Sequence, residues 1–222
     1  MDSHVSVAID GPVASGKTAV GRLLAERMHC RFLDTGAMYR AVTLSVLDAD
    51  IDPEDENAVA SLLTGLDLEV EWKGREAGFK VNGEDVTSRL RDAHVGPAVS
   101  LVSRVPAVRA ALVEKQQALA REGPIVMAGR DIGSVVLKHA TLKLYLDASL
   151  AVRARRRFEE LRGTARCAGY SNVVEELSLR DKIDSERRHS PLRPADGAVR
   201  MDTGTRGVGE LVTEIERLLA DR

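Results

Sequence analysis

The residues with the clearest chemical meaning lie near the N-terminus, in the segment VSVAIDGPVASGKT at residues 5–18. The segment fits the pattern G-x-x-x-x-G-K-[ST], in which glycines let the backbone curl around a phosphate. The lysine supplies a positive charge for the β and γ oxygens, and the threonine offers a hydroxyl to Mg²⁺. The spacing therefore predicts a site for a nucleoside triphosphate. The residues expected to bind it are Gly11, Pro12, Val13, Ala14, Ser15, Gly16, Lys17 and Thr18.

Such a loop needs a strand before it and a helix after it. Apolar side chains alternate in residues 5–9, which is typical of a short buried strand, and residues 19–28 form an amphipathic segment. Free N–H groups and the positive end of the helix dipole would then face an anion. The alternative is a chance match in an ordinary strand-to-helix turn, and the flanking strand and helix argue against it.

A second candidate phosphate site follows the next expected strand, residues 31–34. The segment LDTGAMYR at residues 33–40 places the Thr35 hydroxyl near a helix start and Arg40 one turn further in. A helix start of this kind can hold a second phosphate. On these residues alone, Thr35 could equally cap the helix while Arg40 is a solvated surface charge.

Charged residues also follow an interior strand. The apolar run IVMA at residues 125–128 is typical of a strand inside a parallel sheet, and Gly129, Arg130 and Asp131 come directly after it. Ligands of open α/β sheets bind at the carboxyl ends of the strands. Arg130 and Asp131 are therefore candidate binding residues.

Two later helices are rich in arginine. The first covers residues 149–162 and has several arginines on one side. The second opens near residue 172 with a capping arrangement and places Arg180, Asp184 and Arg187 on one face. For Arg180 and Asp184 the alternative is an ordinary i,i+4 ion pair. The arginines that share a side of the first helix are Arg153, Arg156 and Arg157.

The remaining segments indicate an α/β chain with an insert. Residues 66–72 alternate with period two, a turn follows, and residues 78–86 carry a second strand and the hairpin signal Asn-Gly, which predicts a small antiparallel sheet. Other expected helices cover residues 35–47, 57–63, 92–103, 106–121 and 208–220, and other expected strands cover residues 142–147 and 198–202.

Composition narrows the class of protein. The 222 residues can bury one large core, and 3% aromatic residues with a net charge of −2 argue against a base-stacking nucleic-acid platform. The first strand begins within about five residues and no apolar run approaches the roughly 20 needed to cross a bilayer. We therefore expect a cytoplasmic protein. Cys30 and Cys167 lie far apart without a CxxC motif, so both are expected as reduced thiols.

Taken together, these segments resemble one family, the bacterial cytidylate kinases, which belong to the nucleoside monophosphate kinases. The resemblance covers essentially the whole chain, including the insert. The segments that carry it are GPVASGKT at residues 11–18, LDTGAMYR at 33–40, AGRDIGSVV at 128–136, DASLAVRARRR at 147–157 and RDKIDSERR at 180–188.

The resemblance implies a three-layer α/β/α fold with a central parallel five-stranded sheet, a small antiparallel insert and a mobile lid. Residues 1–222 would form one kinase domain that transfers the γ-phosphoryl of ATP to CMP or dCMP, with Mg²⁺ as cofactor. The partners would be these nucleotides, without nucleic acid or membrane, and the chain would be a monomer. The implied divisions are a core at about residues 1–34, 106–152 and 190–222, a monophosphate-binding subdomain at about 35–105, and a lid at about 153–189.

Phosphoryl transfer requires positioning and charge neutralisation, and it needs no nucleophilic side chain. The resemblance assigns the Mg²⁺ contact to Thr18. It assigns catalytic roles to Lys17, Arg130, Arg153, Arg157 and Arg187. It assigns the binding of CMP to Thr35, Arg40, Ser100, Arg109, Arg130, Asp131, Arg180, Asp184 and Arg187.

By the same resemblance, Ser100, Arg109 and Asp131 read the base, while Arg180 and Asp184 contact the sugar. Cytosine presents two acceptors and one amino donor, and an arginine beside a carboxylate matches that pattern. Uracil reverses the polarity at N3 and at position 4, which leaves both side chains facing the wrong groups. Several kcal/mol of discrimination is expected from such mispairing.

Three other interpretations remain. A P-loop kinase for a small metabolite such as shikimate or gluconate would share the core, but it would not need the insert or the GRD segment. A non-catalytic nucleotide sensor would not need so many arginines near the γ-phosphate. An RNA-binding role for residues 153–166 is disfavoured by the negative net charge and the scarcity of aromatic residues.

Overall fold

The computed structural model describes residues 4–162, 169–188 and 190–222, so that Gly163, Arg166 and Cys167 lie outside the described residues. The strands are β1 (Ser6–Asp10), β2 (Arg31–Asp34), β3 (Leu68–Lys73), β4 (Glu76–Val81), β5 (Glu84–Asp85), β6 (Ile125–Gly129), β7 (Leu142–Asp147) and β8 (Val199–Asp202). The α-helices are α1 (Lys17–Arg27), α2 (Thr35–Asp48), α3 (Glu56–Leu62), α4 (Val95–Val102), α5 (Pro106–Arg121), α6 (Leu150–Leu161), α7 (Tyr170–Glu186) and α8 (Val208–Ala220). The described residues also include the 3₁₀ turns η1 (Leu63–Gly65) and η2 (Arg89–Arg91) and the π-helical turn η3 (Ile132–Val136).

One sheet runs through the molecule in the order β3-β4-β2-β6-β1-β7-β8, with β5 paired to β4. The strands β2, β6, β1, β7 and β8 are parallel, whereas β3, β4 and β5 pair antiparallel. This matches the predicted parallel sheet of five strands with an antiparallel insert. The carboxyl ends of the parallel strands meet at one edge, where Asp10 lies level with Gly129 and Tyr145.

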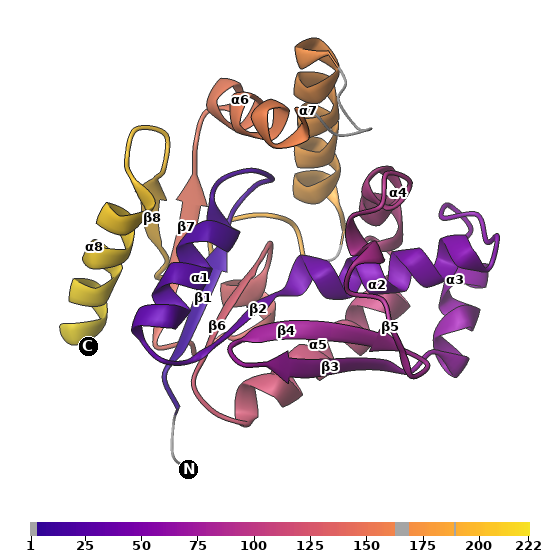
Figure 1. Cartoon of the computed structure of the whole chain (residues 1–222), viewed down its shortest axis with the longest axis horizontal. Coiled ribbons are helices and arrows are strands. Elements are labelled where there is room, and N and C mark those ends of the chain that lie inside the picture. Colours follow the sequence, from indigo (N-terminus) through magenta and orange to yellow (C-terminus); the bar gives the residue numbers. More distant parts are fainter. Residues whose placement is uncertain (1–3, 163–168, 189) are drawn as a thin grey trace.

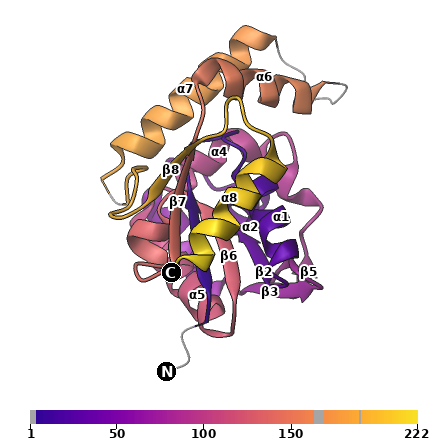
Figure 2. The same ribbon diagram turned by 90° about the vertical axis from the view of Figure 1, so that its left-hand side faces the viewer.

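Helices cover both faces of the sheet, as the views in Figures 1 and 2 show. On one face α1 and α8 pack against apolar side chains of the parallel strands, and on the other face α2, α4 and α5 do so. Alternating residues of a strand serve the two faces, so that Val7 and Ile9 of β1 face α1 while Ala8 faces α2. This is the predicted three-layer arrangement.

The pair α6 and α7 forms a small unit of its own beyond the carboxyl end of β7 (Figure 1). Ala154 and Leu161 of α6 are buried against Val173 and Leu177 of α7. Within the described residues, no single helix is long and apolar enough to cross a membrane, and α4 and α5 reach that length only together across a bend of 94°.

The structure differs from the sequence-based expectations in several places. The helix expected at residues 92–103 covers only Val95–Val102. The insert is not a separate sheet, because β4 pairs parallel with β2 at Phe32 and Glu76. The helix expected to open near residue 172 begins at Tyr170, directly after Gly169, whose extended backbone occupies the N-cap position. The turn η3 was not predicted, since its residues carry no helical periodicity long enough to recognise.

Candidate functional site

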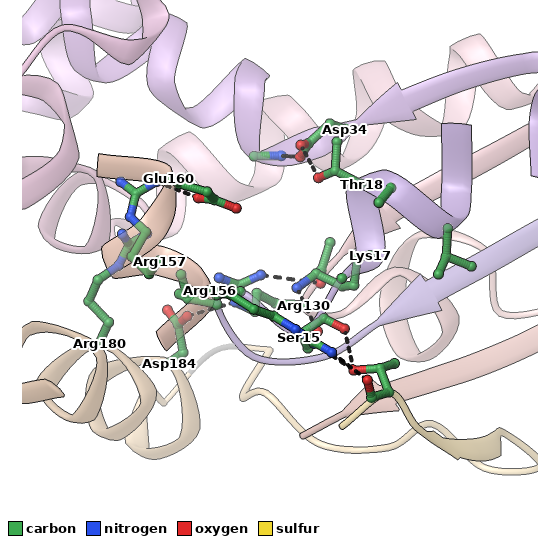
Figure 3. A pocket seen from close by; sticks show the side chains of 18 of the residues that line it. Ser15, Lys17, Thr18, Asp34, Arg130, Arg156, Arg157, Glu160, Arg180 and Asp184 are labelled. Atoms are coloured by element: carbon green, nitrogen blue, oxygen red, sulfur yellow. Dashed lines mark hydrogen bonds and ion pairs between the residues drawn. The ribbon is translucent and has the colours of Figure 1, made fainter. Parts of the chain in front are cut away.

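A cavity of about 1200 Å³ lies between the first loop, the carboxyl ends of the strands and the helices α4 to α7. Figure 3 shows Lys17, Thr18 and Asp34 on one side of it and Arg157, Arg180 and Asp184 on the other. Three of the predicted site residues do not line the cavity, namely Gly11, Pro12 and Arg153. The predicted residues that line it are Val13, Ala14, Ser15, Gly16, Lys17, Thr18, Thr35, Arg40, Ser100, Arg109, Arg130, Asp131, Arg157, Arg180, Asp184 and Arg187.

The first loop has the geometry of a phosphate cradle. Gly11 has φ 151°, and a Cβ there would lie 2.1 Å from the carbonyl oxygen of Leu146, so no side chain fits. Gly16, with φ 89°, precedes α1, and within the described residues no side chain caps this helix. The first N–H groups of α1 therefore face the cavity, where they can bind an anion.

Lys17 is buried beside this helix start. Its Nζ donates to the carbonyl oxygen of Pro12 at 2.5 Å and lies 3.4 Å from the Ser15 hydroxyl. Burial, reinforced by the charge of Arg130, holds the pKa of Lys17 well below its usual value. A buried ammonium group that repels a neighbouring guanidinium gains most from an added anion.

The start of α2 resolves the two interpretations of Thr35. The carboxylate of Asp34 caps the helix by accepting the N–H of Gly36 at 3.1 Å, while the Thr35 hydroxyl donates to the carbonyl oxygen of Ala128 at 3.0 Å. The capping interpretation of Thr35 is therefore wrong. The other oxygen of Asp34 accepts from the Thr18 hydroxyl at 2.9 Å, which joins β2 to the phosphate loop.

A buried ion pair lines one part of the cavity. The guanidinium of Arg109 donates to Oδ2 of Asp131 and, at 3.1 Å, to the carbonyl oxygen of Ser103. The same guanidinium lies 5.5 Å from the centre of the Tyr39 ring. Ser100 is buried beside them and also lines the cavity. A planar guanidinium, a carboxylate and a hydroxyl thus line the same part of the cavity, and the hydrogen bonds of the guanidinium hold it in position.

The turn after β6 also reaches α7. Nε of Arg130 donates to Oδ2 of Asp184 at 2.8 Å. Arg180, one turn earlier on α7, lies 3.6 Å from Glu176, and the ordinary i,i+4 pair with Asp184 is not found within the described part of the chain. The guanidinium of Arg187 lies 3.8 Å from Asp131 and 3.9 Å from Asp184, so it stands between the two carboxylates.

The arginines of α6 have different surroundings. Arg157 lines the cavity and pairs with the exposed Glu160 at 3.1 Å. Arg153 lies behind the cavity, where it donates to the carbonyl oxygens of Ala148 and Val13 and pairs with Asp181 of α7 at 2.7 Å. The catalytic role expected for Arg153 stays a prediction, and its contacts in this structure join the phosphate loop to α7.

The site holds more positive charge than its own carboxylates neutralise. Burial, and then the charges of neighbouring arginines, lower the pKa values of Arg180 and Arg187. Burial alone would raise the pKa of Asp184, but Arg130, Arg187 and Arg180 together outweigh it and the net pKa is lowered. Among the described residues, the Nε atoms of Arg157 and Arg180 and an Nη atom of Arg187 are buried without a hydrogen-bond partner. Such donors are suited to a multiply charged anion.

Sequence reasoning missed two residues that line the cavity, Asp34 and Thr203, and one that is buried behind it, Asp10. Asp10 is buried at the end of β1, Asp34 ends β2, and Thr203 follows β8. The Thr203 hydroxyl donates to the carbonyl oxygen of Ser15 at 3.0 Å and accepts from Arg156, also at 3.0 Å. The rule that identified Arg130 and Asp131, a polar residue at the carboxyl end of a parallel strand, would have identified all three.

A comparison with protein families identifies the family to which this chain belongs. The family model described as "Cytidylate kinase" matches residues 7–221. The chain belongs to the cytidylate kinase family. Relatives named cytidylate kinase include one from Geobacillus kaustophilus, 43% identical over 222 residues that cover 100% of this chain and 99% of the relative. Another, from Bacillus subtilis, is 41% identical and covers 97% and 96% of the two chains.

Among solved structures, an uncharacterized protein from Eubacterium ventriosum has a TM-score of 0.52 at 12% identity, with 98% of this chain and 99% of that chain covered. At that identity the likeness concerns the fold alone. The segments that carried the resemblance to this family all contribute residues to the cavity: the phosphate loop, the start of α2, the turn after β6 and the arginine-rich helices.

Proposed function

We propose that this member of the cytidylate kinase family transfers the γ-phosphoryl group of ATP to CMP or dCMP, giving ADP and CDP or dCDP. One observation carries the proposal: a single cavity has the phosphate loop at one side and the buried pair Arg109 and Asp131 at the other. A donor and an acceptor nucleotide can therefore meet within one cavity, as in-line transfer requires.

The phosphate loop binds the donor in this proposal. The N–H groups at the start of α1 hold the β-phosphate, and Lys17 exchanges the carbonyl of Pro12 for oxygens of the β- and γ-phosphates. The buried, repelled ammonium group of Lys17 supports this exchange, because phosphate offers it the counter-charge that Pro12 does not.

The oxygens of Thr18 and Asp34 fit a Mg²⁺ ion that accompanies ATP. They lie 2.9 Å apart at the mouth of the phosphate loop, and Mg²⁺ prefers such hard oxygen ligands. Within the described residues, no cluster of three or more His, Cys, Asp or Glu could hold a metal. This suits Mg²⁺ bound by phosphates and one or two side chains, where it would neutralise developing charge on the phosphoryl oxygens.

The arginines between the loop and α7 hold the acceptor phosphate. Arg130 and Arg187 carry the charge, while Thr35 and Arg40 approach from α2, where the guanidinium of Arg40 lies 3.5 Å from the carbonyl oxygen of Leu90. Arg180 and Asp184 then face the sugar. The buried donors of Arg180 and Arg187 that lack a partner among the described residues support this assignment.

The pocket around Arg109 reads the base. Arg109 donates to O2 and N3 of cytosine, and Asp131 accepts from the 4-amino group, with the buried Ser100 also lining the pocket. Uracil would place a donor against Arg109 and an acceptor against Asp131, and each mispaired buried group costs about 1–3 kcal/mol. The rigidity of the pair supports this reading, because both side chains are nearly fully buried.

Catalysis then consists of alignment and charge neutralisation. Lys17, Arg130, Arg157 and Arg187 surround the moving phosphoryl group, and such groups act without forming a covalent intermediate. The lid, α6 and α7, would move to bring Arg157 closer. We include in this proposal the division of residues 1–222 into core, monophosphate-binding subdomain and lid, the monomeric state, the absence of nucleic-acid and membrane partners, and a cytoplasmic location.

A coupled assay of ADP release tests the proposed activity. The protein is supplied with ATP and Mg²⁺ and offered CMP, dCMP, UMP, AMP, shikimate and gluconate in parallel, with ATP alone as the blank. We expect turnover with CMP and dCMP well above that with UMP. No turnover with CMP or dCMP would contradict the proposal, and turnover with shikimate or gluconate would favour the metabolite kinases instead.

A further inference from the structure

Asp10 is a buried carboxylate for which the proposed reaction has no direct use. It is the last residue of β1, it precedes the phosphate loop, and it is 2% exposed. Burial raises its pKa to about 6, which means that the fold holds the charged form at a cost near neutral pH. A buried charge of this kind needs specific partners, and these indicate what it does.

Both oxygens of Asp10 accept hydrogen bonds from the backbone of one turn. Oδ1 accepts from the N–H of Ile132 at 2.7 Å and Oδ2 from the N–H of Gly133 at 2.8 Å. These are the two residues that follow Asp131, whose side chain pairs with Arg109. The side chain of Asp10, which lies directly before the phosphate loop, therefore holds the backbone turn that follows Asp131.

The backbone around this anchor has little room to adjust. A Cβ on Gly129 would lie 2.6 Å from both the side chain of Ile132 and the hydroxyl of Thr35. Among the described residues, two charged groups face Asp10. One is Asp131, which directly precedes η3, and the other is Lys17 of α1. The negative charge of Asp131 opposes that of Asp10, so the two carboxylates are not neighbours by mutual attraction, and the backbone hydrogen bonds hold them in place.

We propose that Asp10 is a positioning residue for recognition of the acceptor base. Its carboxylate fixes η3, and through it Asp131, at the depth where Asp131 meets the amino group of cytosine. This inference rests on the proposed function, because it assumes that Asp131 reads the base. Asp10 is expected to touch neither nucleotide, since it does not line the cavity.

Asp10→Asn is the test variant. The amide keeps the shape but turns one acceptor into a donor, so one of the two N–H groups of the turn loses its partner. We expect the KM for CMP to rise about 10-fold and the preference for CMP over UMP to fall about 10-fold, while the KM for ATP changes less than about 2-fold. A defect that is only structural would lower the amount of active enzyme and leave both KM values unchanged.

Asp55→Asn is the matched control. Asp55 is an exposed residue that also accepts two backbone N–H groups, those of Asn57 and Ala58, and it lies outside the cavity lining. Its replacement is expected to leave both KM values and the CMP preference unchanged. If Asp10→Asn does not fold, Asp10→Ser, which is smaller and keeps one oxygen acceptor, is measured in the same way.

A double-mutant cycle with Asp131→Asn shows whether Asp10 acts through Asp131. We expect the two losses of CMP preference to be non-additive, so that Asp10→Asn has little further effect once Asp131 is replaced. Additive losses, or an unchanged KM for CMP in the single Asp10 variant, would overturn the inference while leaving the proposed function intact. Failure of the unaltered protein to phosphorylate CMP would instead contradict the proposed function.

Discussion

Arg130 and Asp184 form a buried ion pair that joins the turn after β6 to α7, with 2.8 Å between Nε and Oδ2. The carboxylate is 7% exposed and the guanidinium 19% exposed. The pair therefore fixes α7 to the carboxyl edge of the sheet at the position where the acceptor phosphate and sugar are proposed to bind.

Asp184→Asn is expected to lower the free energy of unfolding by about 2–4 kcal/mol near neutral pH, because it leaves the charge of Arg130 buried without its partner. Since the pKa of Asp184 is lowered by Arg130, its contribution is present above the unfolded pKa and is lost as the pH falls through the folded pKa. Urea unfolding of both proteins near pH 7 measures the difference. Equal stability of the two proteins at that pH would contradict a stabilising role for the pair.

Lys17→Met is expected to lower kcat by about 10³-fold, because the variant loses the charge that follows the transferring phosphoryl group. The melting temperature should not fall, because the fold holds the charged lysine at a cost. ADP release and a thermal melt measure the two quantities. Lys73→Met, a change at an exposed lysine paired with Asp85, should leave kcat unchanged.

Asp131→Asn is expected to shift the preference from CMP toward UMP by about 10- to 100-fold, because the amide can donate to O4 of uracil. The ratio of kcat/KM for the two nucleotides measures this shift, and their shared phosphate cancels from the ratio. Asp52→Asn, at an exposed carboxylate that accepts the N–H of Glu54, serves as the control. An unchanged ratio in Asp131→Asn would show that the base is read elsewhere.

The two arginines of α6 with assigned catalytic roles should give different results. Arg157→Ala is expected to lower kcat about 10²- to 10³-fold with little change in stability, since its pair with Glu160 is exposed on one side. Arg153→Ala is expected to lower the free energy of unfolding by about 2–4 kcal/mol, because it leaves Asp181 and two carbonyl groups without their donor. Kinetics and urea unfolding of both variants provide the comparison. Full stability of Arg153→Ala together with a loss of kcat would return Arg153 to a direct catalytic role.

The raised pKa of Asp10 predicts a pH dependence of stability. Between pH 3.8 and about 6 the folded protein binds this proton more tightly than the unfolded chain does, so ionisation of Asp10 lowers the free energy of unfolding as the pH rises. The difference between the unaltered protein and Asp10→Asn should therefore change by about 2 kcal/mol from pH 4.5 to pH 7.5. Urea unfolding at both pH values measures it. A constant difference would show that Asp10 has an ordinary pKa in the fold.

The sequence predicted the elements well wherever local periodicity dominates. The helix Pro106–Arg121 and the strand Leu142–Asp147 have the predicted bounds, because a proline starts the first and an alternating apolar run defines the second. The pairing of β4 with β2 could not be predicted, because periodicity gives the faces of a strand and not its neighbour.

Side-chain partners were harder to predict than the membership of the site. Motif spacing placed Arg180 and Asp184 in one cavity, but it could not reveal that Asp184 pairs with Arg130, which is far away in the sequence. For Arg153, helical spacing suggested the same side as Arg157, which lies about 40° away around the helix axis, yet Arg157 lines the cavity while Arg153 packs against Asp181 of α7. Such details depend on packing between elements.

The pairing of Phe32 with Glu76 also limits how this fold can be taken apart. Because β4 continues the main sheet beyond β2, deleting the hairpin would turn β2 into an unprotected edge strand. It would also uncover apolar residues that now pack against Leu68 and Phe79. The insert is therefore part of the main sheet. A variant without residues 66–86 would need other changes that protect the exposed edge of β2.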